Sequence, residues 1–314
     1  MERAGRHSIL VIMAKTSVIK TGFQCNNNCI FCIQDNSRYT KKTQSTEEVK
    51  KILKENVKTS KEIVLTGGEV TIRGDIFELV KFAKECGYES IQVQSNGRMF
   101  SYMDFCEKLI NVGANEFGIS IHGSTSEIHD KLIRVEGGFK QVYKGLNNLK
   151  ELKQKICTNT VVTKINYKDL PNITKILIDF NVFEHNFTFL YLNFNIMKDK
   201  KLIEEIAPKY VDVRKYIEKC LRMGIEAKIK IRTEAFPFCV LGKKYHHFIK
   251  ALCVPDNIVY ENDIIFDFKG KNIKSDIGKK KFEICKQCKF YDVCEGPWIS
   301  YGKIFGEEEF KPIN

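Results

Sequence analysis

Three cysteines near the start of the chain, Cys25, Cys29 and Cys32, lie in the run CNNNCIFC. Their spacing lets a short loop supply three thiolates to one cubane iron-sulfur cluster, which leaves the fourth iron without a protein ligand. An iron with a vacant position can bind and activate another molecule. Zinc is the alternative, but a zinc site needs a fourth ligand at short spacing, and the nearest following histidine is His122.

A second cysteine group, Cys285, Cys288 and Cys294, lies in CKQCKFYDVC near the C-terminal end. The C-x2-C-x5-C spacing can wrap a metal centre locally, and a fourth ligand is still needed. Cys239 in FPFCVLG is the first candidate and Cys253 in ALCVPD is the second. A second iron-sulfur cluster and a four-thiolate zinc site would both be satisfied by these ligands, and both interpretations stay open.

The composition is that of a globular protein, with 43% hydrophobic residues and no apolar run long enough to span a bilayer. The N-terminus has no small-residue cleavage site after its short apolar patch, so we expect a cytoplasmic protein with reduced cysteines and no membrane partner. The net charge of +12 would attract nucleic acid, but the lysines are scattered, which favours a compositional bias. Four further cysteines are expected to be buried apolar side chains: Cys86, Cys106, Cys157 and Cys220.

Apolar runs rich in Ile, Val and Phe alternate with amphipathic helical patterns about every 25 to 35 residues. The predicted strands are Ser17–Phe23, Ile63–Thr66, Ser90–Gln94, Glu116–Ile121, Ile156–Thr163 and Asn186–Asn193. The predicted helices are Thr46–Asn56, Asp75–Glu85, Tyr102–Asn111, Phe139–Leu152, Leu170–Asp179 and Leu202–Met223. Strands that alternate with helices pair in parallel, which predicts an α/β fold with a partial (βα)6 TIM-like barrel. We expect the barrel in residues 1–225 and a small cysteine-rich domain in residues 226–314.

The residues that could take part in chemistry follow the ends of the predicted strands. In such barrels, the loops at these ends carry the active site. The cysteine loop follows the first strand and Gly67-Gly68-Glu69 follows the second. Ser95-Asn96-Gly97 follows the third, and Ser120 and His122 end the fourth. These residues are therefore expected to converge on one edge of the sheet.

The cysteine loop, with Phe31 directly before its last cysteine, resembles the signature loop of the radical S-adenosylmethionine (radical SAM) enzymes. LTGGEVTIR resembles the Gly-Gly-Glu segment of the same family, and the resemblance covers about residues 17–193. It implies that S-adenosylmethionine binds the open iron and that one electron, from a donor such as flavodoxin or ferredoxin, cleaves it to a 5'-deoxyadenosyl radical. It implies a peptide substrate first and a small metabolite second, while RNA is supported only by the positive charge.

The resemblance also assigns contacts with S-adenosylmethionine. Gly67 and Gly68 would let the backbone approach the methionyl amino group, and Glu69 would accept a hydrogen bond from it. Ser120 resembles the serine that contacts the ribose, and Arg134 lies where related enzymes place an arginine that pairs with the methionyl carboxylate. No catalytic residue is assigned beyond the cluster.

Further contacts are implied at the ends of the third and fifth strands. Ser95 and Asn96 would present polar groups to the cofactor, and Phe31 would lie beside it. Val162 and Asn166 would flank the adenine, although core packing is the stronger interpretation for Val162. The later histidine His129, like His122, is more typical of a structural histidine than of a catalyst.

The C-terminal cysteines resemble the auxiliary-cluster domains called SPASM or twitch. The next cysteine of the full SPASM pattern is missing after Cys294, so the resemblance implies a single auxiliary cluster. A non-enzymatic electron carrier or redox sensor is the alternative of another class. The Gly-Gly-Glu segment and Arg134 argue against it, because a carrier needs no methionine pocket.

Overall fold

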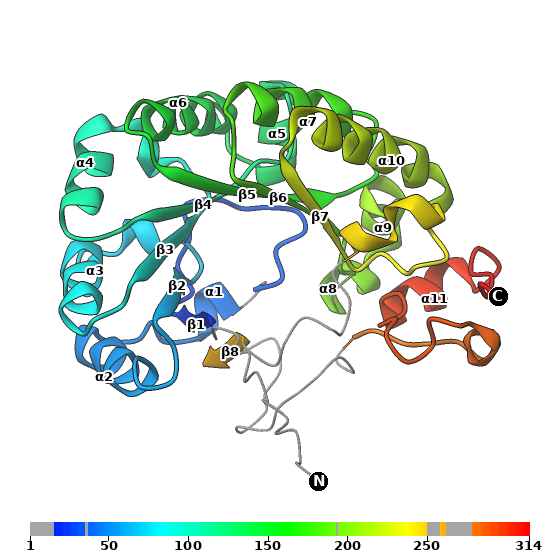
Figure 1. Cartoon of the computed structure of the whole chain (residues 1–314), viewed down its shortest axis with the longest axis horizontal. Helices are drawn as coiled ribbons and strands as arrows, with labels where there is room; N and C mark the ends of the chain where they lie inside the picture. The colour runs from blue at the N-terminus through cyan, green and yellow to red at the C-terminus, as the bar shows by residue number, and fades with distance from the viewer. Residues whose placement is uncertain (1–15, 35–36, 193, 250–257, 262–277) are drawn as a thin grey trace, which may run out of the picture.

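A curled parallel sheet with helices on its outer face is the frame of the molecule, as Figure 1 shows. The computed structural model describes residues 16–34, 37–192, 194–249, 258–261 and 278–314. In that part of the chain the sheet has eight strands in the order β7-β6-β5-β4-β3-β2-β1-β8, and all neighbours are parallel. The strands are β1 (Thr16–Lys20), β2 (Glu62–Thr66), β3 (Ser90–Ser95), β4 (Glu116–Ser120), β5 (Lys155–Val162), β6 (Glu184–Phe189), β7 (Lys230–Glu234) and β8 (Ile258–Glu261).

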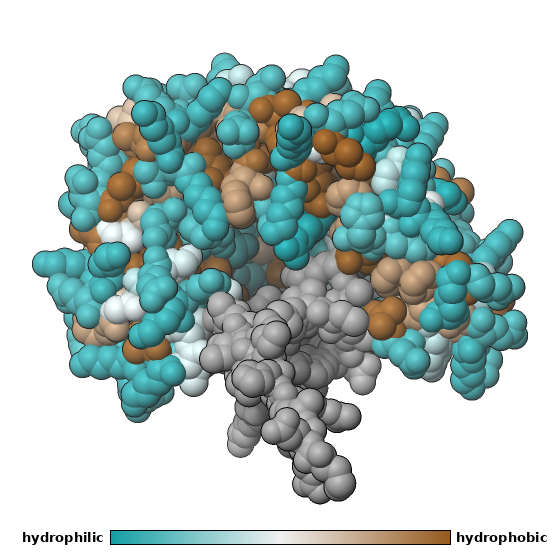
Figure 2. Space-filling model, viewed as in Figure 1, coloured by the Kyte–Doolittle hydropathy of each residue, from teal (hydrophilic) through white to brown (hydrophobic). Residues whose placement is uncertain are grey.

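Helices connect most successive strands, because a parallel neighbour is reached only by a crossover. They are α1 (Ser37–Thr40), α2 (Thr46–Asn56), α3 (Ile76–Glu85), α4 (Met103–Asn111), α5 (Ser126–Ile133), α6 (Gly138–Glu151), α7 (Leu170–Asp179), α8 (Phe194–Lys198), α9 (Lys200–Ile206), α10 (Tyr210–Ala227) and α11 (Ile299–Phe305). The 3-10 turns are Val70–Ile72, Met99–Ser101, Lys243–Phe248 and Glu283–Gln287. Figure 2 shows that the outward surface of the helical arc is mostly hydrophilic, with hydrophobic side chains visible between the helices.

The partial barrel that the sequence predicts is confirmed, and its six predicted strands are β1 to β6. The helices predicted at Thr46–Asn56 and Leu170–Asp179 have the same bounds in the structure. The first strand ends at Lys20 instead of Phe23, and the sixth ends at Phe189, before its predicted end. The helix α5 lies between β4 and β5 and is not among the predicted elements.

The strand β7 is also missing from the six predicted strands. Its sequence is KIRTE, in which only Ile231 and Thr233 are buried. The residues that alternate with them are charged and line the other face of the sheet. A strand with one charged face carries too few apolar residues to stand out from a loop in the sequence.

The helix predicted at Leu202–Met223 is wrong in its continuity, because the structure divides it into α9 and α10. Pro208 lies between the two helices. A proline removes one backbone donor and disfavours helical geometry in the residue before it, and Ala207 has the extended ψ of 117°. The chain therefore turns between two separate helices.

The domain boundary predicted after residue 225 falls in the last turns of α10, and the sheet continues beyond it. The later strand β7 pairs with β6, and Thr188 lies opposite Glu234 in that pair. The C-terminal segment packs on the same core, where the ring centroids of Tyr210 and Tyr301 are 4.6 Å apart. Within the described residues, no helix combines the length and apolar character needed to cross a membrane.

Candidate functional site

The cysteine loop follows the carboxyl end of β1, and its three cysteines are half-buried. Burial raises the pKa of the Cys29 thiol to about 12, and the neighbouring thiols of Cys32 and Cys25 act in the same direction. Burial also raises the pKa of the Cys25 thiol, while the backbone N–H of Asn27, 3.4 Å from Cys25 Sγ, favours the thiolate. The three thiols therefore interact electrostatically, and a cation placed among them would release their protons.

Two arginines hold the loop by hydrogen bonds. Arg38 donates to the Asn27 carbonyl and to Asn28 Oδ1, both at 2.7 Å. Arg98 donates to the Asn26 carbonyl at 2.6 Å and to Asn27 Oδ1 at 3.1 Å. The sequence prediction missed both arginines, although Arg98 follows the predicted Ser95-Asn96-Gly97 segment directly and its position is the one available signal.

The end of helix α5 also supports the loop. The N–H groups of Asn28 and Ile30 donate to the carbonyls of Ile133 and Leu132, at 2.9 and 3.0 Å. These carbonyls belong to the last turn of the helix, where they have no intrahelical partner. Arg134 follows in the left-handed conformation, with φ of 55°, and its side chain is exposed. Arg134, the arginine predicted to bind a carboxylate, thus directly follows a residue that is hydrogen-bonded to the cysteine loop.

The Gly-Gly-Glu segment packs against the residues that lead into the cysteine loop. The N–H of Gly68 donates to the Gly22 carbonyl at 2.9 Å, and the N–H of Glu69 donates to the Gln24 carbonyl at 2.7 Å. A Cβ on Gly68 would lie 2.2 Å from the carbonyl oxygens of Gln24 and Phe23. The glycine is therefore required for the close approach of these two segments.

Glu69 is buried, and its carboxylate joins the ends of β2 and β3. Oε1 accepts from the N–H and Oγ1 of Thr71, and Oε2 accepts from the N–H of Asn96 at 2.6 Å. Burial raises the pKa of the Glu69 carboxyl, and these hydrogen bonds, together with one from Ser95, oppose the shift. The side chain of Asn96 donates to Asn26 Oδ1 at 2.7 Å, so this cluster also contacts the cysteine loop.

The remaining predicted contacts fall into two groups. Ser120 is half-buried at the end of β4, and Phe31 packs edge-on against His122 with ring centroids 4.8 Å apart. Val162 and Asn166, in contrast, are fully buried. Their side chains hold the fold together, so a contact with adenine at this place would have to use the backbone.

Asn166 illustrates this structural use of a polar side chain. Its Nδ2 donates to the carbonyls of His122 and Val161, both at 2.9 Å, and its Oδ1 accepts from the N–H of Thr163 at 2.7 Å. His122 is also held by two hydrogen bonds. Its ring Nδ1 accepts from the backbone N–H of Val161, and its backbone N–H donates to Nδ1 of His129. Burial lowers the pKa of both histidines, to about 4 for His129, so both rings are neutral.

The donor set of the cysteine loop fits a 4Fe-4S cluster. It combines three interacting thiols, a backbone amide directed at Cys25 Sγ and the nearby positive charge of Arg38, which favours the Cys25 and Cys29 thiolates. Among the described residues, no three His, Cys, Asp or Glu side chains converge closely enough to hold one ion. A cubane cluster is larger than a single ion, and its ligands stand farther apart.

The second cysteine group comes together from two parts of the chain. Cys239 follows β7, and burial raises its thiol pKa to about 12, with Cys294, Cys285 and Cys288 contributing in that order. Backbone amides point at three of the sulfurs: Gly296 N lies 3.4 Å from Cys294 Sγ, Ile313 N lies 3.4 Å from Cys288 Sγ, and Lys311 N donates to Cys239. Such N–H to sulfur bonds stabilise metal-bound thiolates.

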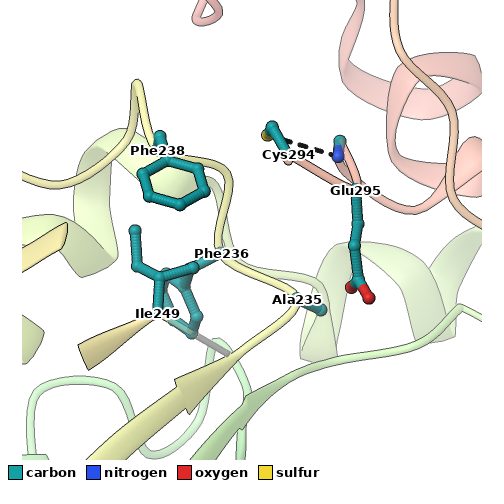
Figure 3. A pocket seen from close by; sticks show the side chains of 7 residues that line it. Ala235, Phe236, Phe238, Ile249, Cys294 and Glu295 are labelled. Carbon is teal, nitrogen blue, oxygen red and sulfur yellow. Dashed lines mark hydrogen bonds between the residues drawn. The ribbon is translucent and has the colours of Figure 1, made fainter. Parts of the chain in front are cut away.

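A small pocket borders this second group. Figure 3 shows Phe236, Phe238 and Ile249 on one side of it and Cys294 and Glu295 on the other. Its lining residues come from the chain that follows β7 and from the C-terminal segment. The pocket therefore lies between the rim of the barrel and the C-terminal segment.

The other cysteines differ in how far they are buried. Cys253, the second candidate for the fourth ligand, lies outside the described residues. Cys106 and Cys220 are buried, as predicted, whereas Cys86 and Cys157 are half-buried. Cys157 is half-buried because it lies on the β5 face opposite to the buried residues Ile156 and Thr158.

Curated relatives share part of their sequence with this chain. The Fe-coproporphyrin III synthase of Methanosarcina barkeri is 30% identical over 156 residues, which cover 49% of this chain and 38% of that protein. The probable GTP 3',8-cyclase of Methanocaldococcus jannaschii is 25% identical over 274 residues, which cover 80% of this chain and 88% of that protein. The chain thus spans well under half of the first relative and most of the second.

Solved structures show the same fold. Streptococcus suis SuiB bound to S-adenosylmethionine superposes with a TM-score of 0.65 at 16% identity, over 96% of this chain and 76% of SuiB. SuiB bound to its precursor peptide SuiA gives 0.57 at 17% identity, over 70% and 48%. The model of the radical SAM superfamily matches residues 19–177, half of the chain, including the cysteine loop and the Gly-Gly-Glu segment. The chain therefore belongs to the radical SAM superfamily of enzymes.

Proposed function

We propose that this enzyme binds a 4Fe-4S cluster at Cys25, Cys29 and Cys32 and cleaves S-adenosylmethionine reductively to abstract hydrogen from a peptide. The observation that carries the proposal is the junction of the cysteine loop with the Gly-Gly-Glu segment, where Gly68 and Glu69 bond directly to residues 22 and 24. When bound, the cluster supplies the electron that generates the 5'-deoxyadenosyl radical, and a one-electron donor such as flavodoxin or ferredoxin would reduce it.

The chain's own residues would position S-adenosylmethionine. Arg134 is exposed beside the loop and can reach a carboxylate with its forked donors. The carboxylate of Glu69 already accepts from Thr71, Asn96 and Ser95, so a methionyl amino group would have to replace one of these donors. Ser120 at the end of β4 would face the ribose.

A peptide substrate is supported by the likeness to the fold of SuiB, which has been solved with a precursor peptide. A tetrapyrrole or nucleotide substrate is the second candidate, because the curated relatives at 25–30% identity are named for coproporphyrin and GTP chemistry.

We further propose an auxiliary 4Fe-4S cluster at Cys239, Cys285, Cys288 and Cys294. The mutual influence of these thiols and the three amides directed at them support it. Four thiolates would complete the coordination of a cubane, so this cluster would serve electron transfer or stability.

The test is anaerobic incubation of the iron-loaded protein with dithionite and S-adenosylmethionine, followed by quantification of 5'-deoxyadenosine. We expect production by the wild type and by Cys86→Ala, which alters a cysteine outside both groups, and loss of production in Cys29→Ala. If the wild type gives no more product than Cys29→Ala, the proposed function is wrong.

A further inference from the structure

The short helix α1 presents exposed side chains beside the cysteine loop. None of its residues is buried, and Tyr39 is 78% exposed. Ile33, which directly follows the last cysteine of the loop, is 47% exposed. From there the N–H of Ser37 donates to the Gln34 carbonyl at 2.9 Å, which turns the chain into α1. Figure 1 shows this helix apart from the outer arc of helices. Large apolar side chains thus reach the surface directly after the cysteine loop.

A third exposed apolar side chain, Ile72, comes from the turn that follows the Gly-Gly-Glu segment. It is 38% exposed, and it lines one small pocket together with Thr43, which lies three residues after α1. The guanidinium of Arg73 donates to the Gln44 carbonyl at 3.0 Å and holds the two segments together. Single exposed apolar side chains are common on proteins, but a group of them beside one functional loop indicates an interaction surface.

Positive charges border these apolar side chains. The guanidinium of Arg38 lies over the ring of Tyr39, 5.4 Å from its centroid, and also donates to the cysteine loop. Lys41 and Lys42 follow α1 directly and are exposed. Neither lysine forms an ion pair with another residue in the described part of the chain. Their charges therefore remain available to a partner.

The glutamates at the start of α2 do not neutralise these lysines. Glu47 pairs with Lys50 at 3.2 Å, and Glu48 accepts from the N–H of Ser45 at 2.6 Å in the helix cap. A surface with apolar side chains and a basic border is complementary to an acidic protein surface.

The exposed face formed by α1 and its neighbours, here called the carrier face, consists of Ile33, Arg38, Tyr39, Lys41, Lys42 and Ile72. We propose that the carrier face docks an acidic one-electron carrier protein, a flavodoxin or ferredoxin, by apolar contact at Tyr39 and charge attraction at Lys41 and Lys42. The inference rests on the proposed function, which requires an external electron, and names the surface by which that electron arrives.

The position of the carrier face suits electron transfer. The reduced carrier would lose one electron, and the cluster would gain it. Such transfer weakens steeply with distance, so the carrier has to dock close to the cluster. Cys32 is half-buried and the exposed Ile33 follows it, while Arg38 connects α1 to the cysteine loop through the Asn27 carbonyl. A cluster held by this loop would therefore lie close to the carrier face.

The test measures the dissociation constant of a purified acidic flavodoxin from the cluster-loaded protein by isothermal titration calorimetry, at low and at high salt. We expect Tyr39→Ser to weaken binding at least about fivefold at low salt, and the double variant Lys41→Gln/Lys42→Gln to do the same. High salt should weaken binding by the wild type more than binding by the double variant, because screening removes the attraction of the two lysines.

Matched controls separate the carrier face from the general positive charge of the protein. Tyr102 is 57% exposed, and Lys144 and Lys175 are exposed on α6 and α7. Tyr102→Ser and Lys144→Gln/Lys175→Gln should bind flavodoxin as the wild type does. Equal weakening in the control variants, an unchanged dissociation constant in the carrier-face variants, or no measurable binding by the wild type would overturn the proposal.

Reduction of the cluster provides a second readout. In anaerobic stopped-flow experiments with subsaturating reduced flavodoxin, the carrier-face variants should be reduced at least about fivefold more slowly than the wild type. Dithionite is small and needs no docking surface, so it should reduce all variants at nearly the wild-type rate. Equal rates with flavodoxin would also contradict the proposal. Neither readout requires cleavage of S-adenosylmethionine, whereas 5'-deoxyadenosine formation with dithionite reports on the proposed function alone.

Discussion

Gly68 shows how the absence of one side chain shapes the cysteine loop. A Cβ at this position would lie 2.2 Å from two backbone carbonyl oxygens, and a backbone cannot move aside as a flexible side chain can. We predict that Gly68→Ala destabilises the protein by about 3 kcal/mol, the upper range for overpacking, and lowers its iron content. Thermal denaturation and iron analysis of the reconstituted protein measure both effects.

Gly74 provides the matched control for this substitution. A Cβ there meets no atom within 4 Å, and the φ angle is not in the left-handed region. Gly74→Ala should therefore leave the melting temperature and the iron content close to those of the wild type. Equal effects of the two substitutions would contradict the role assigned to the close approach at Gly68.

The buried histidine His185 predicts a pH dependence of stability. Burial lowers its pKa to about 3, while its Nδ1 lies 2.7 Å from Thr158 Oγ1. The unfolded chain has a histidine pKa of about 6.5, so between pH 6.5 and 3 the unfolded state binds more protons than the folded state. The contribution of His185 to the free energy of unfolding is therefore fully present above pH 6.5. Below this pH, the contribution falls by up to about 1.4 kcal/mol per pH unit.

His185→Asn should remove this contribution and keep a partner for Thr158. Urea denaturation at pH 7.5, 6.0 and 5.0 gives the free energy of unfolding of each protein. The pH slope of the wild type should exceed that of the variant. Parallel slopes would show that His185 titrates alike in both states.

At the scale of elements, the sequence predicts the features that depend on residues close together in the chain, such as helix ends and short motifs. The helix α2 could be predicted to the residue because Ser45 and Glu48 form its capping box, and α7 because Pro171 lies in its first turn. The cysteine loop and the Gly-Gly-Glu segment could be predicted because each is a contiguous motif.

What the sequence did not predict depends on partners that are distant in the chain. Arg98 reaches the cysteine loop across 72 positions, and Asn186 reaches Glu234 across 48. Polar residues in such contacts have the same types as residues on an exposed surface, so their pattern carries no signal. The charged inner face of β7 escaped prediction for the same reason.

The contact of Arg98 with the cysteine loop gives a prediction at this scale. Arg98 links the end of β3 to the Asn26 carbonyl and, through Gln141, to helix α6. Arg98→Met should increase the rate at which a chelator removes iron by about tenfold, as expected for groups that support metal ligands. Arg222→Met, which changes an exposed arginine of α10, should show the wild-type rate. Equal rates in all three proteins would exclude a supporting role for Arg98.

At the scale of the whole molecule, aromatic packing joins the C-terminal segment to the barrel. Tyr210 stacks on Phe189 at the end of β6, with ring centroids 3.8 Å apart, and its N–H donates to Tyr301 Oη at 3.1 Å. Trp298 Nε1 donates to the Phe189 carbonyl. The auxiliary cysteines lie across the same junction, because Cys239 follows β7 and the others belong to the C-terminal segment. A metal centre there would fasten the two parts together.

The auxiliary centre therefore predicts both a metal count and a change in stability. The reconstituted wild type should contain about eight irons per chain, and Cys239→Ala about four, because the loss of one of four ligands removes the auxiliary cluster. Cys239→Ala should also lower the melting temperature, since metal binding at the junction contributes to folding free energy. Cys253→Ala is the control and should keep eight irons. If the wild type contains about four irons and one zinc, the auxiliary centre is a zinc site. If Cys253→Ala loses metal and Cys239→Ala does not, Cys253 is the fourth ligand.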